Sequence, residues 1–353
     1  MNPTRLLVRL PNWVGDILMA RPAVEAIRAR WPEAQVVGMA RAPHTALVER
    51  FGAFDLIVEA PGGAGLARAA EVWAAARRLR VRRLDTAVIL APSFEAALGP
   101  WLASIGRRIG HDTDHRRWLL TDPVAPRPGA HRTDEYLDLA RVLDAVDRPS
   151  PASPLVLTAA DRAWAARLFD TLAWQEDSRP LFVNPAAAKT PRAWSAEKFR
   201  ALVERLSGSG RPVVVHDRPP FAAPPDWAGR HGAALVRDAT LPELAALLAR
   251  CALYVGNDSG PAHIAAAVGI PTVTIHGPSS PGRTAPRGTG EGARVAVTAS
   301  FPCSPCRERF FDECPAPPSA DGRPPCLEAV TVDEVAAAVR QVLGRTFTRR
   351  ASP

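Results

Sequence analysis

A short polar turn, Asn257-Asp258-Ser259-Gly260, lies between an apolar run and a helix of small residues. Backbone N–H groups at such a helix start are unpaired, and the helix dipole makes that end positive. Gly260 has no side chain to keep a ligand from the backbone. The turn predicts a diphosphate site in which Asp258 accepts from ribose hydroxyls and His263 faces the same ligand. The alternative is that the turn only caps the helix and His263 is structural.

A carboxylate, Asp16, follows the first apolar run at the start of a predicted helix. One carboxylate in that position is sufficient to take a proton from a hydroxyl group that attacks a reactive carbon. Asp16 is therefore a candidate general base. The alternative is that it caps the helix and interacts with the helix dipole.

Two cations, Lys189 and Arg192, lie on a loop after another apolar run. Lys189 is one of only two lysines in the chain, and a compact ammonium group on a loop is suited to reach a phosphate. Arg192 is suited to the same task. The alternative is a solvated loop with Trp194 packed beneath it.

The elements that must position these residues are strands and helices in alternation, which is typical of an α/β fold with mostly parallel sheets. In the first half we expect strands at 5–10, 35–40, 56–59 and 86–90, and helices at 15–30, 43–51 and 66–80. In the second half we expect strands at 181–184, 212–215, 253–256 and 271–276, and helices at 195–206, 241–250, 259–268 and 331–343. Parallel strands end at one edge of a sheet, so the polar turns that follow them should converge there.

The length of 353 residues predicts two domains, because a single core rarely grows that large. The segment DRPSPASP at 147–154 is rich in proline and serine, as linkers are. We therefore expect an N-terminal domain at 1–155, a C-terminal domain at 156–330, and a final helix and tail at 331–353.

Two segments resemble one known family. NDSGPAHIAAAVGIPTVTIHGPSSP at 257–281 is similar to the nucleotide-sugar motif of the ADP-heptose:lipopolysaccharide heptosyltransferases, glycosyltransferase family 9. WVGD at 13–16 is similar to the family's acceptor-side motif. The resemblance covers about residues 5–340 and implies the GT-B architecture, in which two Rossmann-like, doubly wound domains face a cleft.

The family's residue roles carry over where the motifs match. The resemblance implies that Asp16 is the base and that Gly15 lets the acceptor come close. It assigns the acceptor side to Asn12, Trp13, Gly15 and Ser93. It assigns the ADP-heptose side to Lys189, Arg192, Thr240, Leu241, Asp258, Ser259, Gly260, His263 and Gly277. A weaker match at 131–139 resembles the family's His-x-x-x-x-Tyr helix entry.

The chain also departs from the family pattern. Ala186 stands where the family has glycine, and the basic residues are shifted relative to Trp194, so the resemblance does not decide whether Lys189 or Arg192 meets the diphosphate. His216-Asp217-Arg218 stands where the family usually has Gly-Ser and an acid for the ribose. Selectivity for the sugar or the base can differ accordingly.

Taken together, the resemblance implies an inverting, metal-independent transfer of heptose from ADP-heptose to the inner core of lipopolysaccharide, with no cofactor. The segments at 13–16 and 93–94 favour the family member that adds the second heptose. One alternative is a related transferase or epimerase that uses another nucleotide sugar. The other is a non-catalytic nucleotide-binding assembly protein.

Four cysteines near the C-terminus, Cys303, Cys306, Cys314 and Cys326, contain one Cys-x-x-Cys pair. Four thiolates satisfy a tetrahedral structural zinc site. Free thiols or a local staple are the alternatives. The proposed catalysis requires no metal at these residues.

Composition limits the partners and the compartment. The net charge of +8 favours phosphorylated or membrane-surface partners, and no basic run with interleaved aromatic residues indicates nucleic acid. Charges at Arg5, Arg9 and Asp16 argue against a signal peptide, and no stretch of roughly 18 apolar residues predicts a membrane span. We therefore expect a cytoplasmic protein, peripheral at the inner membrane, that acts on a lipid-linked lipopolysaccharide acceptor. The oligomeric state is open, with a monomer as the default.

Overall fold

The computed structural model describes residues 2–63, 65–146, 153–187, 192–219, 233–288, 292–295, 301, 303, 304, 306, 314 and 322–350. Contacts within the chain divide it into two compact units, Met1–Val156 and Leu157–Pro353. The predicted linker lies mostly outside the described residues. The final helix belongs to the second unit, whereas the sequence suggested a separate C-terminal segment.

The first unit contains a six-stranded parallel sheet in the order β3-β2-β1-β4-β5-β6. Its strands are β1 (Arg5–Arg9), β2 (Gln35–Arg41), β3 (Leu56–Ala60), β4 (Thr86–Ile89), β5 (Arg107–His111) and β6 (Asp122–Val124). The central strands β1 and β4 are almost wholly buried, as expected for a sheet covered on both faces.

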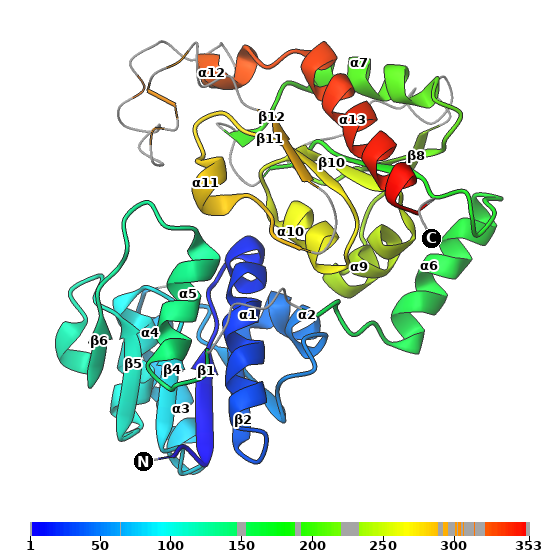
Figure 1. The fold of residues 1–353 in the computed structure, drawn as a ribbon. Helices are drawn as coiled ribbons and strands as arrows, with labels where there is room; N and C mark the ends of the chain where they lie inside the picture. Colours follow the sequence, from blue (N-terminus) through cyan, green and yellow to red (C-terminus); the bar gives the residue numbers. More distant parts are fainter. Residues whose placement is uncertain are drawn as a thin grey trace. The chain divides into compact units, whose positions relative to one another are not determined.

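Helices cover both faces of this sheet. They are α1 (Val14–Arg30), α2 (Thr45–Glu49), α3 (Gly65–Arg80), α4 (Phe94–Leu102) and α5 (Arg132–Arg141), with short 3-10 helices η1 (Ala42–His44) and η2 (Arg117–Leu119). Helices α1 and α5 pack against each other (Figure 1). Helices α3 and α4 also pack together, and their apolar residues form one core with alternate residues of β1, β2 and β4.

The second unit repeats this topology. Its parallel sheet has the order β12-β11-β10-β7-β8-β9. The strands are β7 (Leu181–Asn184), β8 (Val213–His216), β9 (Ala233–Val236), β10 (Leu253–Asn257), β11 (Thr272–Ile275) and β12 (Gly292–Val295). The helices are α6 (Ala159–Thr171), α7 (Ala196–Ser207), α9 (Leu241–Arg250), α10 (Gly260–Ala267), α11 (Pro281–Thr284), α12 (Pro325–Glu328) and α13 (Val332–Arg350).

The predicted helix starts are set by caps. The Ser195 side chain accepts from the Lys198 backbone N–H at the start of α7. Thr240 with Glu243 and Thr331 with Glu334 form reciprocal capping boxes before α9 and α13. These three starts confirm the predicted ones.

All predicted strands are present, within two residues at each end, so the doubly wound α/β class is confirmed. Among the described residues, no helix is both long enough and apolar enough to span a bilayer.

Candidate functional site

Each sheet has a point where the strand order reverses. The chain winds outward from β1 through β2 to β3, and then returns to place β4 on the other side of β1. In the second unit the corresponding point lies between β7 and β10. Loops leave such a pair of strands in opposite directions and open a crevice at the carboxyl edge, which is where open α/β sheets bind ligands.

A pocket of about 140 Å³ lies at the reversal point of the first unit. It is lined by residues that follow β1, β4 and β5 and by the start of α5: Pro11, Asn12, Trp13, Asp16, Leu90, Pro92, Ser93, His111, Arg132, Glu135 and Tyr136. The structure thus brings together three of the four predicted acceptor-side residues, Asn12, Trp13 and Ser93, with the candidate base Asp16. Gly15 lies in the same first turn of α1 but does not line the pocket.

Asp16 occupies the first turn of α1, three residues after its N-cap, Trp13. Its carboxylate is half-buried, and Oδ1 accepts a hydrogen bond of 3.3 Å from the Tyr136 hydroxyl. Burial first and the nearby Asp16 second raise the pKa of Tyr136 well above its usual value, so the phenol stays protonated and donates. Asp16 is therefore held between the dipole of α1 and a buried donor on α5.

Behind the pocket lies a buried cation. Arg9 at the end of β1 is 3% exposed, and its Nη2 donates to Asn12 Oδ1 at 2.8 Å. His44 contacts the Asn12 carbonyl oxygen at 3.1 Å. Burial lowers the pKa of Arg9 to about 10, so the guanidinium remains charged at neutral pH. These contacts fix Asn12 and place a positive charge near the reversal point.

His111 is a pocket residue that the sequence analysis missed. It ends β5, is 7% exposed, and its Nε2 has no hydrogen-bond partner in the described part of the chain. Burial, followed by the charge of Arg116, lowers the pKa of His111 to about 4, so the ring is neutral at pH 7. His111 lines the pocket, while its Nε2 is itself buried without a partner in the described residues. Only the strand order places His111 in the pocket, because β5 ends beside β4.

At the reversal point of the second unit, Asn184 connects three elements. Its Nδ2 donates to the Ala186 carbonyl at 2.9 Å and to Ser259 Oγ at 3.1 Å, and its Oδ1 lies 2.8 Å from His216 Nδ1. Burial lowers the pKa of His216 to about 4. The neutral ring donates to the amide oxygen and so fixes which way the Asn184 amide points. Ser259, the N-cap of α10, is positioned by this chain of bonds.

Helix α10 begins at the edge of the sheet beside β7. Ser259 makes no capping bond of its own, and Pro261 has no N–H to offer. Ser259 and Gly260 are partly exposed, while His263 is 6% exposed and lies on the buried side. The first turn of α10 therefore presents backbone N–H groups and a positive dipole end at the position where the sequence predicted a diphosphate.

Asp258 has partners within the protein. It is 4% exposed, its Oδ2 accepts from the Thr284 hydroxyl at 3.2 Å, and the same oxygen lies 3.8 Å from His276 Nδ1. The carboxylate thus connects β10 to α11 and to the end of β11. Contact with a ribose stays a prediction for this residue.

A hydrogen bond connects the segment that follows β7 to β10. The Trp194 backbone N–H donates to Asn257 Oδ1 at 2.9 Å, and the indole of Trp194, 2% exposed, donates to the Val330 carbonyl. Trp194 is therefore buried, as the alternative interpretation expected of this side chain. Arg192, two residues earlier, is partly exposed. Lys189 lies outside the described residues.

Other predicted donor-side residues have clear structural roles. Thr240 caps α9, so it begins the helix that contains Leu241. A Cβ at Gly277 would lie 2.7 Å from the Cβ of Leu327, which means that the glycine allows α12 to pack on this loop. Ser304 donates to the Gly277 carbonyl at 2.5 Å. These contacts position the loop without showing a ligand contact.

The cysteine cluster carries free thiols. Burial first, and then the charges of Cys306, Cys303 and Cys314, raise the pKa of Cys326 to about 11. Within the residues that the structure describes, no group of three or more His, Cys, Asp or Glu side chains is arranged to hold a metal ion. A structural zinc site at these thiols stays a prediction.

Comparison with known proteins gives a consistent result. The sequence profile described as glycosyltransferase family 9 (heptosyltransferase) matches residues 72–314. Lipopolysaccharide heptosyltransferase 2 of Salmonella typhimurium is 30% identical over 305 residues, covering 80% of this chain and 85% of the relative. The Escherichia coli protein of the same name is 29% identical over the same shares. The solved structure of E. coli ADP-heptose lps heptosyltransferase II superposes with a TM-score of 0.74 at 23% identity, covering 97% of this chain and 99% of that one, which supports the GT-B fold.

Proposed function

Because the chain belongs to glycosyltransferase family 9 and is a glycosyltransferase, we propose that it transfers heptose from ADP-heptose to the inner core of lipopolysaccharide. The proposal includes the acceptor for the second heptose, which the segments at 13–16 and 93–94 favour. The observation that carries it is the position of Asp16, whose carboxylate lines the pocket at the reversal point of the first sheet.

In the proposed reaction, Asp16 takes the proton of an acceptor hydroxyl as its oxygen attacks the anomeric carbon of the heptose. The new C–O bond forms on the face opposite the diphosphate, the bond from the anomeric carbon to the diphosphate breaks, and ADP leaves. The configuration at the anomeric carbon is thereby inverted. Asp16 ends the step protonated and returns its proton to solvent.

The environment of Asp16 supports this role. Tyr136 holds one carboxylate oxygen at 3.3 Å and so orients the other. Asn12 and Ser93 supply polar groups for the sugar hydroxyls. Trp13, 63% exposed at the mouth of the pocket, offers an aromatic face against which a sugar ring can pack.

The second unit would bind the donor. Backbone N–H groups at the start of α10, with Ser259 and Gly260, are proposed to bind the diphosphate, and His263 to face the same ligand. Arg192 or Lys189 would add positive charge, so that the departing ADP is stabilised without a metal ion. Thr240, Leu241, Asp258 and Gly277 would complete the nucleotide site. The reaction then requires no cofactor.

The acceptor is proposed to be a lipid-linked lipopolysaccharide core, reached at the cytoplasmic surface of the inner membrane. Both relatives are named as lipopolysaccharide heptosyltransferases. The net charge of +8 favours such phosphorylated partners.

The test compares three proteins: the parent, Asp16→Asn and Asp16→Glu. Each is incubated with ADP-heptose and defined inner-core acceptors, and the products are weighed by mass spectrometry. Loss of a general base lowers kcat by roughly 10²–10⁴-fold. Asp16→Asn should show that loss while retaining affinity for ADP, because the nucleotide is held by the other unit. Asp16→Glu keeps a carboxylate and should lose less.

Asp16→Glu serves as the matched control for a merely structural role. It keeps a negative charge in the first turn of α1, so a helix-dipole role predicts near-parental activity and melting temperature. Parental turnover by Asp16→Asn would refute the assignment of the base. Preference for UDP over ADP in a panel of nucleotide sugars would refute the donor.

A further inference from the structure

Aromatic side chains are exposed along the outer surface of α3, α4 and η2. Trp73, Trp101 and Trp118 are 59%, 40% and 61% exposed. The Trp118 ring packs edge-on against Trp101, with centroids 5.7 Å apart, and lies 5.8 Å from Phe94. A stable fold gains nothing by leaving three indoles in water, so this surface is a candidate for contact with another molecule.

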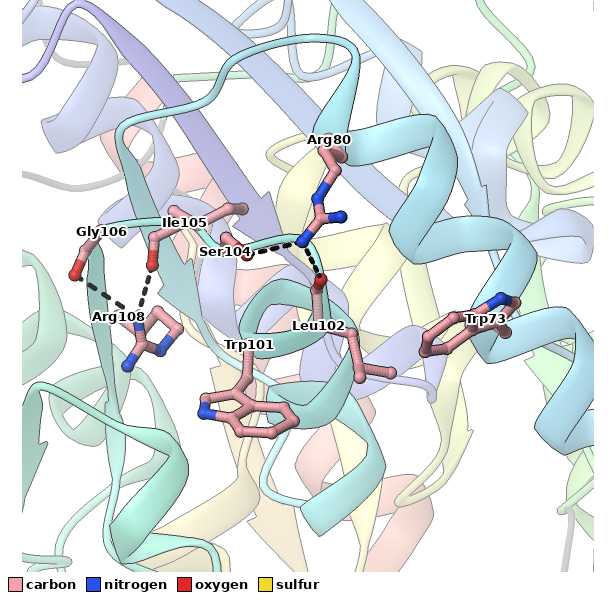
Figure 2. Close-up of a pocket in the computed structure, with 8 residues that line it drawn as sticks. All are labelled: Trp73, Arg80, Trp101, Leu102, Ser104, Ile105, Gly106 and Arg108. Carbon is pink, nitrogen blue, oxygen red and sulfur yellow. Dashed lines mark hydrogen bonds between the residues drawn. The ribbon is translucent and has the colours of Figure 1, made fainter.

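A hollow of about 520 Å³ separates two of these indoles. Trp73 and Trp101 line it together with Leu102, and Arg80 and Arg108 line it as well (Figure 2). The hollow lies where α3 and α4 end and β5 begins, which is the amino edge of the sheet. It is therefore at the opposite edge from the pocket that contains Asp16.

The two arginines of the hollow bond only to neutral groups in the described part of the chain. Arg80 donates to Ser104 Oγ at 2.8 Å and to the Leu102 carbonyl (Figure 2). Arg108 donates to the carbonyls of Leu119 and Ile105. None of the eight lining residues is acidic. The positive charges at this surface are thus not balanced by a neighbouring carboxylate.

Helical spacing extends the positive charge along α3. Residues three and four apart share one face of a helix, so Trp73, Arg77 and Arg80 lie in one row. Arg78 is also exposed, but it lies outside that row. We call Trp73, Arg77, Arg80, Trp101 and Arg108, with Trp118, the Trp-Arg face.

We propose that the Trp-Arg face docks on a bilayer surface that contains anionic phospholipids. Indole rings are amphipathic and favour the boundary between headgroups and acyl chains, and arginines close to that boundary are attracted by phosphate charge. The exposed tryptophans suit the boundary between headgroups and acyl chains, and the cations that lack acidic partners suit the lipid phosphates. A second copy of the chain fits less well, since it would bring two sets of guanidinium groups together.

This inference is independent of the donor and the acceptor in the proposed function. It concerns a surface at the other edge of the sheet from Asp16, and pure phospholipid vesicles can test it.

The experiment measures co-sedimentation of the full chain with vesicles of phosphatidylethanolamine and phosphatidylglycerol, and with vesicles of phosphatidylcholine alone. We expect binding to the anionic vesicles only. Each arginine near a bilayer contributes roughly fivefold in binding, so Arg80→Glu should weaken partitioning by at least that factor. The double variant Trp73→Ala/Trp101→Ala should weaken it comparably.

Arg78→Glu is the matched control, because it changes the net charge identically on the same helix but outside the row. It should weaken binding less than Arg80→Glu does. Equal losses would overturn the proposal in favour of general charge attraction. Binding that requires the glycolipid acceptor in the vesicle, or a dimer in the parent that the tryptophan variant abolishes, would also overturn it. Melting curves of all variants establish that they fold, and turnover of a delipidated acceptor reports separately on the proposed function.

Discussion

Gly256 of β10 pairs with Asn184 of β7 and leaves no room for a side chain between them. A Cβ at this position would lie 2.5 Å from the Asn184 backbone oxygen on β7 and 2.8 Å from the Tyr254 hydroxyl. Neither group is the end of a flexible side chain that can swing away, since one is strand backbone and the other is a buried phenol. Gly256→Ala must therefore push β7 and β10 apart.

The size of the effect follows from this geometry. Ordinary contacts of a Cβ begin near 3.4 Å, so the two strands would need to separate by most of an ångström. Overpacking of this kind costs about 3 kcal/mol. For a unit of this size that corresponds to a fall in melting temperature of roughly 6–12 °C. The displacement acts on Asn184, which bonds Ser259, so affinity for ADP should fall as well.

Differential scanning calorimetry measures the first effect and isothermal titration with ADP measures the second. Gly208→Ala is the matched control in the same unit, because Gly208 is exposed at the end of α7 with a φ of −72°. A Cβ there meets its nearest neighbour at an ordinary 3.6 Å. If Gly256→Ala melts with the parent and binds ADP equally well, the spacing of β7 and β10 described above is wrong.

Two further predictions test the two sites. Tyr136→Phe removes the hydrogen-bond donor to Asp16 while keeping the ring. Because a hydrogen bond to a charged group contributes about 1.5–3 kcal/mol, kcat should fall roughly tenfold while KM for ADP-heptose stays unchanged. An unchanged kcat in steady-state kinetics would contradict the orienting role of Tyr136. The pKa of His216 is about 4 in the folded chain against 6.5 as its ordinary value, so the unfolded chain binds the extra proton first as pH falls. Stability from His216 is therefore complete above pH 6.5 and declines by about 3 kcal/mol as pH falls from 6.5 to 4. His216→Asn keeps a donor toward Asn184 but does not titrate. Its free energy of unfolding, measured with urea at pH 7, 6, 5 and 4, should therefore fall less steeply with falling pH than that of the parent. An equally steep fall would refute the role assigned to His216.

The sequence by itself determined which segments are strands and helices. Runs such as 181–184 and 253–256 are apolar throughout, as strands buried on both faces must be, and Ser195, Thr240 and Thr331 mark helix starts through bonds to nearby backbone. The motifs around Asp16 and Ser259 indicated the family because they depend on contiguous residues. Such local patterns can be recognised without knowledge of the fold, since the residues that make each contact are only a few positions apart.

The tertiary structure alone decided which distant residues meet. His111 and Tyr136 join Asp16 in one pocket only because β5 lies beside β4 and α5 packs on α1. His216 reaches Ser259 through Asn184 because β8, β7 and α10 are neighbours in space. It likewise placed the Asp258 carboxylate beside the Thr284 hydroxyl, a contact that the sequence analysis did not predict. Strand order is set by the packing of whole helices on both faces of the sheet, and no short stretch of sequence encodes it.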